Sequence, residues 1–536
     1  MVREIGMAKH QHCPMNSYHA LRMMKSLCGF FAFFGIVHLF YAPIVGQGAM
    51  FGTWDSWGNL AMFHEVRSFF EAGADAVRSG QYFAGFENPW INYGLDFWGG
   101  IPWVVLTWCG VDAMDSMYWN VVIILALNAL SLYQLLRFLS VSKIVALGLS
   151  FAFVLNPVMF HYADWINLLC LFPAIFAAKH LLDFHQDGNR LSIKKGCLWI
   201  AILLPLNPYG FIFSFTLGAC VFLCHSAFWH ATRPLLWNGI LLVGPIVGLY
   251  AFAYALPNLS QSQATVIDPL YSLWSHPDLQ FTLSSLLKGS TLSSLPSPLK
   301  GYEYTFLESK NAFMGYGLSV VAFIGLICRP RFFIAVLLYL FIACALDVGV
   351  IRVDYRWGLP FLVLIPLAAG LGLKDIQSSP FKVTALPLLL FAVLETASFN
   401  PRISPQSYPE LSPVVQQKIG ALDVVLHLPA GIHGQQKSIR NYQYMMLRHQ
   451  KETPYSIING GGFYYPKELL FLYNDIVPST TDDNFKEENL KNLGITKIIL
   501  HEELCYDSLD HQQIDLVRKR NYSTIDVIEA SVIPLP

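Results

Sequence analysis

The sequence is poor in charge. Of its 536 residues, 13% are Asp, Glu, Lys or Arg, whereas 54% are hydrophobic and the mean hydropathy is +0.44. Soluble proteins carry about 25% charged residues, and a water-soluble surface of this size needs more polar side chains than the chain contains. The composition therefore predicts a membrane protein. The net charge of -1 is unlike the basic surface of nucleic-acid-binding proteins, so no nucleic-acid partner is expected.

The ten cysteines form no CxxC pair and no Cys/His cluster with metal-ligand spacing. Most of them lie inside apolar segments, as Cys28, Cys170 and Cys220 do. Disulfide frameworks and zinc sites are recognised by such spacings. The sequence thus predicts neither a disulfide framework nor a metal site.

Long apolar segments, in contrast, are abundant. A spanning helix needs about 20 apolar residues, and about eleven segments approach that length. They lie at 27–45, 117–138, 143–160, 164–183, 196–207, 210–228, 235–256, 313–328, 331–350, 356–373 and 381–397. Residues 1–26 are polar and basic, and the segment after them lacks a small-residue cleavage site, so we interpret it as a retained anchor helix. The predicted fold class is an α-helical polytopic membrane protein, with the transmembrane domain at 27–398.

Basic residues predict the orientation of these helices. Every short loop assigned to the cytoplasm contains Lys or Arg, and these residues lie at 137–143, 190–195, 233, 329–331 and 374–382. The N-terminus is then cytoplasmic, the C-terminus is periplasmic in a bacterial inner membrane, and the large outer loops are 46–116 and 257–312. An apolar segment at 97–111 would reverse this pattern if it spanned. We expect it to be a re-entrant or interfacial helix with Trp98, Trp103 and Trp108 at headgroup depth.

The tail, residues 399–536, has the composition of a soluble protein. Short apolar segments at Asp423–Leu428 and Ile495–His501 predict strands, and 464–474 and 484–493 predict helices. This alternation indicates a small extracytoplasmic α/β domain.

The first outer loop contains candidate site residues. Asp55 lies between Trp54 and Trp57, just after the first apolar segment. Its carboxylate could deprotonate an acceptor hydroxyl or bind a metal beside a phosphate, or it could simply cap a helix. His64 and Glu65 follow on an interfacial helix predicted over Asn59–Ser79, either as part of a site or as its solvated face.

Two further outer turns hold ionisable residues at membrane depth, where such residues are costly and usually face a cavity or a partner. One turn contains His161 and Asp164, and Asp164 could act in a site or cap the next helix. The other contains Arg352, Tyr355 and Arg356. Guanidinium groups match phosphate oxygens, although an ion pair with Asp354 or contact with lipid phosphate would also explain these arginines.

Together these features resemble the C-superfamily (GT-C) of polytopic glycosyltransferases, which take sugar from a polyprenyl-phosphate carrier. The tail is similar to that of bacterial members in its order of motifs, which lie at 423–429, 442–449, 454, 459–462 and 493–501. The resemblance implies that Asp55 activates the acceptor, that Asp164 is a second acid and that Arg356 contacts the carrier phosphate. Many relatives show paired acids in the first loop, whereas Ser56 and Trp57 follow Asp55 here, so a requirement for a divalent cation stays open.

The leading hypothesis is therefore a membrane glycosyltransferase. Its expected partners are a polyprenyl-phosphate sugar donor, membrane lipid, and a glycan, lipid or protein acceptor. The alternatives are a transporter or flippase of a lipid-linked saccharide, and a non-catalytic membrane scaffold. A transporter would show broken helices in paired positions, for which Asn207-Pro208 is the only candidate in the sequence.

Overall fold

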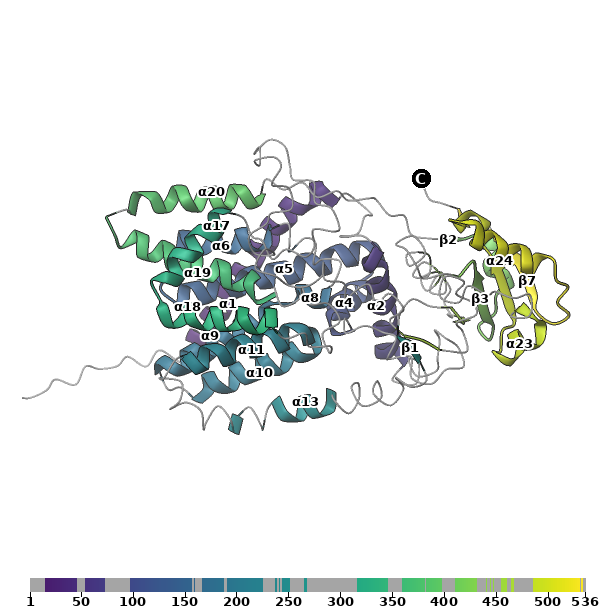
Figure 1. The fold of residues 1–536 in the computed structure, drawn as a ribbon, viewed down its shortest axis with the longest axis horizontal. Coiled ribbons are helices and arrows are strands. Elements are labelled where there is room, and N and C mark those ends of the chain that lie inside the picture. Colours follow the sequence, from purple (N-terminus) through teal and green to yellow (C-terminus); the bar gives the residue numbers. More distant parts are fainter. Residues whose placement is uncertain are drawn as a thin grey trace, which may run out of the picture.

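The computed structural model describes most of the helical part of the chain and much of the tail. The described residues are 15–45, 54–72, 97–156, 166–187, 190–224, 244–250, 265–267, 316–345, 359–380, 382–397, 410–430, 455–459, 464–466, 485–530 and 532–533, with single residues at 159, 237, 238, 241, 243, 440, 444 and 447. In Figure 1 the helices form an elongated bundle, and the tail lies at one end of it.

The helices of the bundle follow the apolar segments. They are α1 (Met15–Val45), α2 (Trp54–Ala72), η2 (Phe97–Gly100), α4 (Ile101–Trp108), α5 (Ala113–Phe138), α6 (Lys143–Val154), α8 (Ile166–Leu169), α9 (Phe172–Asp187), α10 (Arg190–Leu206), α11 (Pro208–Cys224), α13 (Gly244–Tyr250), α17 (Tyr316–Ile327), α18 (Pro330–Ala345), α19 (Leu359–Gln377), η10 (Lys382–Thr384) and α20 (Ala385–Ala397). Helix α5 is central and packs against α1, α4, α6 and α9.

Several of these helices are shorter than a bilayer is thick. Within the described residues, three helices are long and apolar enough to cross a membrane: Met24–Pro43, Ala113–Phe138 and Leu359–Gln377. A fourth would result if Gly317–Ile327 and Pro330–Ala343, bent by 119°, were one span. Helix α6 has 12 residues, which is about 18 Å against a hydrocarbon core of about 30 Å. The chain is a membrane protein, and the total of about eleven spans remains a prediction.

Two predicted helices differ in the structure. The segment predicted to span at 164–183 is broken into α8 and α9, with Cys170 and Leu171 between them. The segment at 143–160 ends as a helix at Val154. Hydropathy could not reveal the first difference, because the residues at the break are as apolar as the helices on either side.

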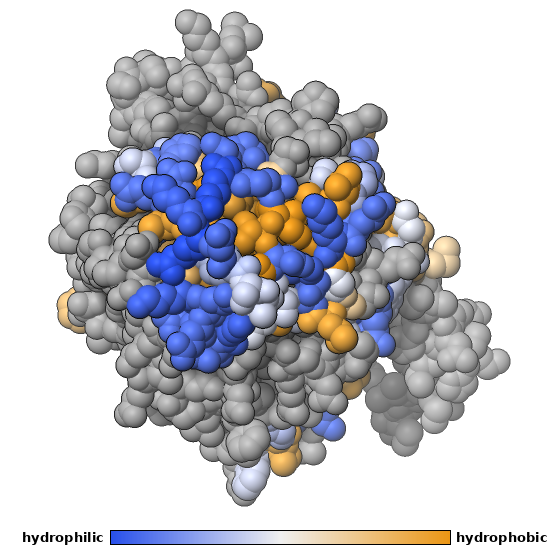
Figure 2. Space-filling model, turned by 90° about the vertical axis from the view of Figure 1, so that its right-hand side faces the viewer, coloured by the Kyte–Doolittle hydropathy of each residue, from blue (hydrophilic) through white to orange (hydrophobic). Residues whose placement is uncertain are grey.

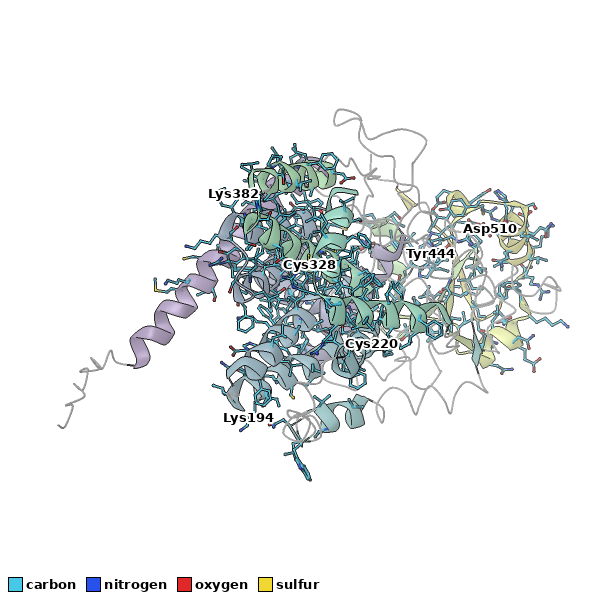
Figure 3. The ribbon with its side chains drawn as sticks, turned by 60° about the vertical axis from the view of Figure 1, so that its left-hand side comes forward. Lys194, Cys220, Cys328, Lys382, Tyr444 and Asp510 are labelled. Atoms are coloured by element: carbon cyan, nitrogen blue, oxygen red, sulfur yellow. The ribbon has the colours of Figure 1, made fainter. Side chains whose placement is uncertain are left out.

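Three loops predicted to be cytoplasmic lie together at one end of the bundle. Arg329 forms an ion pair of 2.8 Å with Asp375, and the Lys374 ammonium donates to the Leu139 carbonyl at 2.9 Å. Figure 3 shows Lys194 and Lys382 on the side of the molecule opposite Tyr444 in the tail. The side of the membrane on which this end of the bundle lies stays a prediction.

Helices α17 and α19 are in close backbone contact. A methyl group on Gly325 would lie 2.0 Å from the Ala368 carbonyl oxygen, and one on Gly372 would lie 2.4 Å from the Val321 carbonyl oxygen. Small residues allow membrane helices to approach to this distance. The two glycines therefore form the closest described helix contact.

The tail contains a four-stranded parallel sheet in the order β4-β3-β6-β7. Its elements are β2 (Glu410–Leu411), α21 (Pro413–Lys418), β3 (Val424–Leu428), β4 (Ser456–Ile457), α23 (Glu487–Asn492), β6 (Lys497–Leu500), η14 (Glu502–Leu504), α24 (Ser508–Arg518), β7 (Asp526–Glu529) and β8 (Val532–Ile533). Strands β3 and β6 and helix α23 lie where the sequence predicts them. Figure 2 shows this end of the molecule with mainly hydrophilic described surface around an apolar strip.

One strand of the large outer loop pairs with the tail. Strand β1 (Thr265–Ile267) is antiparallel to β5 (Tyr464–Pro466), with Val266 opposite Tyr465. The helix predicted at 464–474 is therefore wrong for its first three residues, which form a strand because β1 offers them a ladder. The pairing also joins two segments that were both assigned to the outer side.

Candidate functional site

The predicted site residues divide into two groups. His161, Asp164, Arg352, Tyr355 and Arg356 lie outside the described residues. Asp55 is the second residue of α2, so it lies within the helix rather than capping it, and its side chain is not described. The described part of the candidate site therefore consists of the elements that hold or follow these residues, together with His64 and Glu65.

Helix α2 packs against the aromatic segment 97–111. The rings of Phe63 and His64 lie 6.0 and 4.8 Å from the Trp103 ring, and the Trp103 indole N–H donates to the Ala113 carbonyl at 2.9 Å. Trp103 is fully buried, whereas Trp108 is half exposed. The prediction that this segment places its tryptophans at headgroup depth stays a prediction, but Trp103 faces protein rather than the surface of the molecule. The helix α2 covers it, and its indole N–H finds a protein partner.

The glycines of η2 bring two candidate loops together. A methyl group on Gly100 would lie 2.4 Å from the Phe63 ring, and one on Gly99 would lie 2.9 Å from the Ile166 side chain. Phe63 lies on the helix that holds Asp55, about 12 Å further along it, and Ile166 begins α8 two residues after Asp164. The 3-10 turn is thus the contact point between the helix that holds Asp55 and the helix that follows Asp164.

Polar side chains surround this contact point. The Asn120 amide of α5 is fully buried and donates to the Gly99 carbonyl at 3.0 Å. Asn59 and Glu65 of α2 are 3% and 1% exposed. A buried carboxylate in a membrane protein is costly and usually marks a partner or a functional cavity. The interpretation of Glu65 as part of a solvated helix face is therefore wrong, since the packing of α2 buries it.

Other polar contacts lie at the same end of the bundle. The Glu395 carboxylate of α20 accepts the Gly317 N–H at the start of α17, at 2.9 Å. Asp112 is the N-cap of α5 and accepts the Met114 N–H at 2.8 Å. Both carboxylates satisfy backbone donors at helix starts. Their roles are explained by capping, which separates them from the candidate acids.

The structure places two buried asparagines that the sequence did not identify as site residues. Asn128 and Asn207 both bond to the backbone where α8 ends and α9 begins. Asn207 was visible as a helix break before Pro208. Asn128 could not be recognised from the sequence as a site residue, because a single amide in a long apolar helix is equally compatible with an ordinary core position.

A second polar cluster lies in the tail, at the carboxyl ends of neighbouring strands. His427 of β3 and His501 after β6 share a hydrogen bond of 2.9 Å between Nδ1 and Nε2, and the Tyr455 hydroxyl lies 3.3 Å from His427 Nε2. Their rings stack with that of Tyr444 at about 5 Å. Burial lowers the pKa of both histidines, and for His427 the neighbouring His501 lowers the pKa further.

An ion pair borders this tail cluster. The Arg440 guanidinium binds both oxygens of Asp510, at 2.6 and 3.2 Å, and donates to the Leu504 carbonyl at 2.8 Å. Both side chains are almost fully buried, and Figure 3 shows Asp510 and Tyr444 within the tail. Because these groups mainly bond to each other and to the backbone, the arrangement is that of a polar core.

Metal-ligating side chains do not cluster within the described residues, where no group of three His, Cys, Asp or Glu could hold an ion. The side chains of Asp55 and Asp164 lie outside the described part of the chain. The described part of the candidate site is therefore a packed junction of helices α2, η2, α5 and α8.

The arrangement of these helices is similar to that of a solved membrane glycosyltransferase structure. This is the cryo-EM structure of the arabinofuranosyltransferase AftD from Mycobacteria, with a TM-score of 0.50 and 14% identity over 80% of this chain and 31% of that chain. The chain thus spans about a third of the length of AftD.

Two structures of an oligosaccharyltransferase from Archaeoglobus fulgidus are also similar. One, in complex with Zn and sulfate, gives a TM-score of 0.46 and 10% identity over 86% of this chain and 67% of that chain. The other, AglB in complex with an inhibitory peptide and a dolichol-phosphate, gives 0.44 and 11% over 87% and 68%. No model of a protein family and no curated protein sequence matches the chain. The likeness is therefore one of fold.

Proposed function

We propose that the protein is a membrane glycosyltransferase that moves a sugar from a polyprenyl-phosphate carrier to a glycan, lipid or protein acceptor on the outer face of the membrane. The observation that carries the proposal is the junction at η2, where Phe63 of α2 and Ile166 of α8 pack against neighbouring glycines. The helix that holds Asp55 and the short helix that follows Asp164, which are distant in the sequence, meet at this junction. A reaction that needs two acids at one carrier-bound sugar fits such an arrangement.

In the proposed chemistry, one group takes the proton of the acceptor and another stabilises the negative charge of the departing phosphate. Asp55 takes the proton of the acceptor hydroxyl as the bond to the sugar forms, and Asp164 is a second acid beside it. Arg356 stabilises the departing carrier phosphate, because its guanidinium can bind two phosphate oxygens at once. Arg352, Tyr355 and His161 are proposed as further contacts to the phosphate or the sugar.

His64 and Glu65 are proposed to support this site through α2. Glu65 is buried at the junction, and His64 packs edge-on against Trp103. Both lie more than two turns beyond Asp55 on the same helix. We expect their replacement to weaken substrate binding more than the chemical step.

The decisive experiment is an assay of sugar transfer from polyprenyl-phosphate donors in membranes that contain the full chain. We expect Asp55→Asn to lower the transfer rate about 100-fold or more, since it removes a general base. Arg356→Ala should raise the donor KM and lower the rate about 10- to 100-fold. This factor corresponds to the free energy of a hydrogen bond to a charged group. Adding a chelator and then Mg²⁺ or Mn²⁺ to the same membranes tests whether a divalent cation takes part.

Matched controls come from residues with assigned contacts. Asp112→Asn keeps an N-cap of similar strength, so its transfer rate should stay within about twofold of wild type. Arg331→Ala removes an exposed guanidinium from a loop assigned to the opposite side of the membrane. Full activity of Asp55→Asn, Asp164→Asn and Arg356→Ala alike would refute the mechanism.

One observation favours a second candidate function, transport of a lipid-linked saccharide. The breaks at Cys170-Leu171 and at Asn207 lie beside each other, and paired broken helices are a feature of transporters. Proteoliposomes with a fluorescent lipid-linked saccharide separate the two functions. Movement of the lipid without any change in its sugar would favour transport over transfer.

A further inference from the structure

The break between α8 and α9 lies within a mainly apolar part of the sequence. Helix α8 ends at Leu169, α9 begins at Phe172, and the residues between them, Cys170 and Leu171, are 1% and 3% exposed. The break is six to seven residues beyond Asp164, on the way into the membrane. A break at this depth exposes backbone N–H and C=O groups that water cannot reach, and each needs a protein partner.

Asn128 of α5 supplies three of these partners. Its amide donates to the Leu169 carbonyl at 2.7 Å, and its side-chain oxygen accepts the Leu171 and Phe172 N–H groups at 3.2 and 2.7 Å. One side chain thus caps the end of α8 and the beginning of α9. Asn128 is fully buried, so these bonds are shielded from solvent.

Asn207 supplies partners from the opposite side. Its amide lies 3.5 Å from the Leu168 carbonyl and 3.4 Å from the Cys170 carbonyl, and its side-chain oxygen accepts the Gly210 N–H at 2.6 Å. It therefore caps its own helix, α11, and the end of α8 at the same time. Pro208 at the first position of α11 lacks the N–H that an additional cap would need to satisfy.

We propose that Asn128 and Asn207 are positioning residues, which hold the break between α8 and α9 and thereby fix the place of α8, the short helix that follows Asp164 in the sequence. The proposal rests on the proposed function, because it assigns the break a role in catalysis. Helix α8 is only one turn long, is held at its end by the two asparagines, and contacts Gly99 through Ile166 at its start. A displacement of the break would consequently move α8 and its contact with Gly99.

The first test is chemical and needs no activity. Cys170 lies at the break, while Cys197 of α10 and Cys220 of α11 are buried elsewhere and serve as internal references. The full chain in detergent is treated with N-ethylmaleimide, and modified cysteines are located by peptide mass spectrometry. In wild type all three should stay protected.

Two variants open the break in different ways. Asn128→Leu removes all three bonds with little change in volume, and Asn207→Asp keeps the cap of α11 but loses both donors to α8. We expect Cys170 to be alkylated about tenfold faster or more in either variant, the effect of losing about one buried hydrogen bond, with Cys197 and Cys220 still protected. The control is Ser131→Ala, which removes a buried hydroxyl that bonds only within α5, to the Asn128 carbonyl.

The second test couples the break to the reaction. With the transfer assay, both variants should lower kcat about tenfold while the donor KM stays within about twofold, because the carrier phosphate is bound elsewhere. In the Asp164→Asn background they should lower kcat no further, since the residue that they position is already absent.

The outcomes separate this proposal from the proposed function. Protection of Cys170 in both asparagine variants would overturn the assignment, as would faster alkylation with an unchanged kcat. Simultaneous reactivity of all three cysteines would show general unfolding and also reject a local role. If the wild-type chain transfers no sugar, the proposed function fails, whereas the alkylation pattern still decides whether the asparagines hold the break.

Discussion

The membrane helices and the tail differ in the partners of their buried polar side chains. In the helices, these side chains bond to backbone: Asn120 to Gly99, Asn128 to Leu169 and Glu395 to Gly317. In the tail, some bond to backbone, as Asn459 and Gln513 do, and others also bond to one another. The Arg440–Asp510 ion pair and the His427–His501 pair are the main examples.

The difference follows from what each region does with its backbone. Wherever a membrane helix stops inside the bundle, its terminal N–H and C=O groups have no water to bind, so side chains must cap them. The parallel sheet of the tail pairs its own backbone along three neighbouring ladders. Its interior polar side chains are therefore free to pair among themselves. Loss of a polar side chain should break a helix end in one region and unpair a charge in the other.

The largest effect is expected in the tail. Arg440→Met would leave the Asp510 carboxylate buried without its cation, which costs about 3–5 kcal/mol of tail stability. The measurement is the temperature at which the tail of the purified full chain becomes sensitive to protease. The Arg440→Met/Asp510→Leu double variant should recover most of the loss, because it removes both charges.

A surface pair in the same sheet is the control for this prediction. Lys497→Met removes the partner of Asp526, whose side chain is 72% exposed, and should cost less than about 1 kcal/mol. If Arg440→Met were no more damaging than Lys497→Met, the tail would not depend on paired buried charges and the comparison would fail.

A smaller effect is expected between α17 and α19. Gly325→Ala would place a methyl group 2.0 Å from the Ala368 carbonyl oxygen, so the helices must separate, at a cost of about 1–3 kcal/mol. Thermal unfolding of the full chain in detergent should show a lower midpoint. Gly218→Ala in α11 has open space around the added methyl group and should leave the midpoint unchanged or raise it. Equal midpoints for the two variants would contradict this account.

An effect of similar size is a pH dependence confined to the tail. The pKa values of His427 and His501 are lowered in the fold, so both are neutral there, and the unfolded chain takes up protons first, near pH 6.5. Their contribution is present above this pH and is lost as the pH falls, by about 1.4 kcal/mol for each histidine and pH unit. Glu503, 3.7 Å from His501, opposes the shift, whereas Arg440 reinforces it.

The same protease assay at pH about 7.5 and about 5.5 measures this dependence. His501→Gln should reduce the difference between the two values, while His511→Gln, at an exposed position of α24, should leave it unchanged. A tail that is equally stable at both pH values would show that the histidine pair accepts a proton without cost.

The described helices of the bundle were well predicted, because an apolar segment of several helical turns is recognisable from its mean hydropathy. Hydropathy missed the break at Cys170-Leu171, although Pro173, which lacks the N–H that would bond to the Leu169 carbonyl, was visible in the sequence. The partner that this carbonyl finds instead, Asn128, lies on α5 and could not be predicted. The burial of Trp103 likewise depends on the cover provided by α2. In the tail, strands β3 and β6 were evident from their apolar residues, but β5 could not be predicted without its partner in the outer loop.

Much less of the candidate site could be predicted. Single acids and arginines at outer turns are compatible with capping, ion pairs or catalysis, and only tertiary contacts separate these roles. The structure separates these roles for three acids. Asp112 and Glu395 cap the first turns of helices through their hydrogen bonds, and Glu65 is buried. The contact between Gly99 and Ile166 gave no sequence signal, because it joins residues that are distant along the chain.

The pairing of β1 with β5 has a consequence for biogenesis. Strand β1 is synthesised long before β5, so its ladder edge stays open until the last described helices and the first part of the tail have been made. An open strand edge invites pairing with other chains. A chain that stalls before residue 464 should accordingly be a preferred target for quality-control proteases, and closure of this ladder marks the completion of assembly.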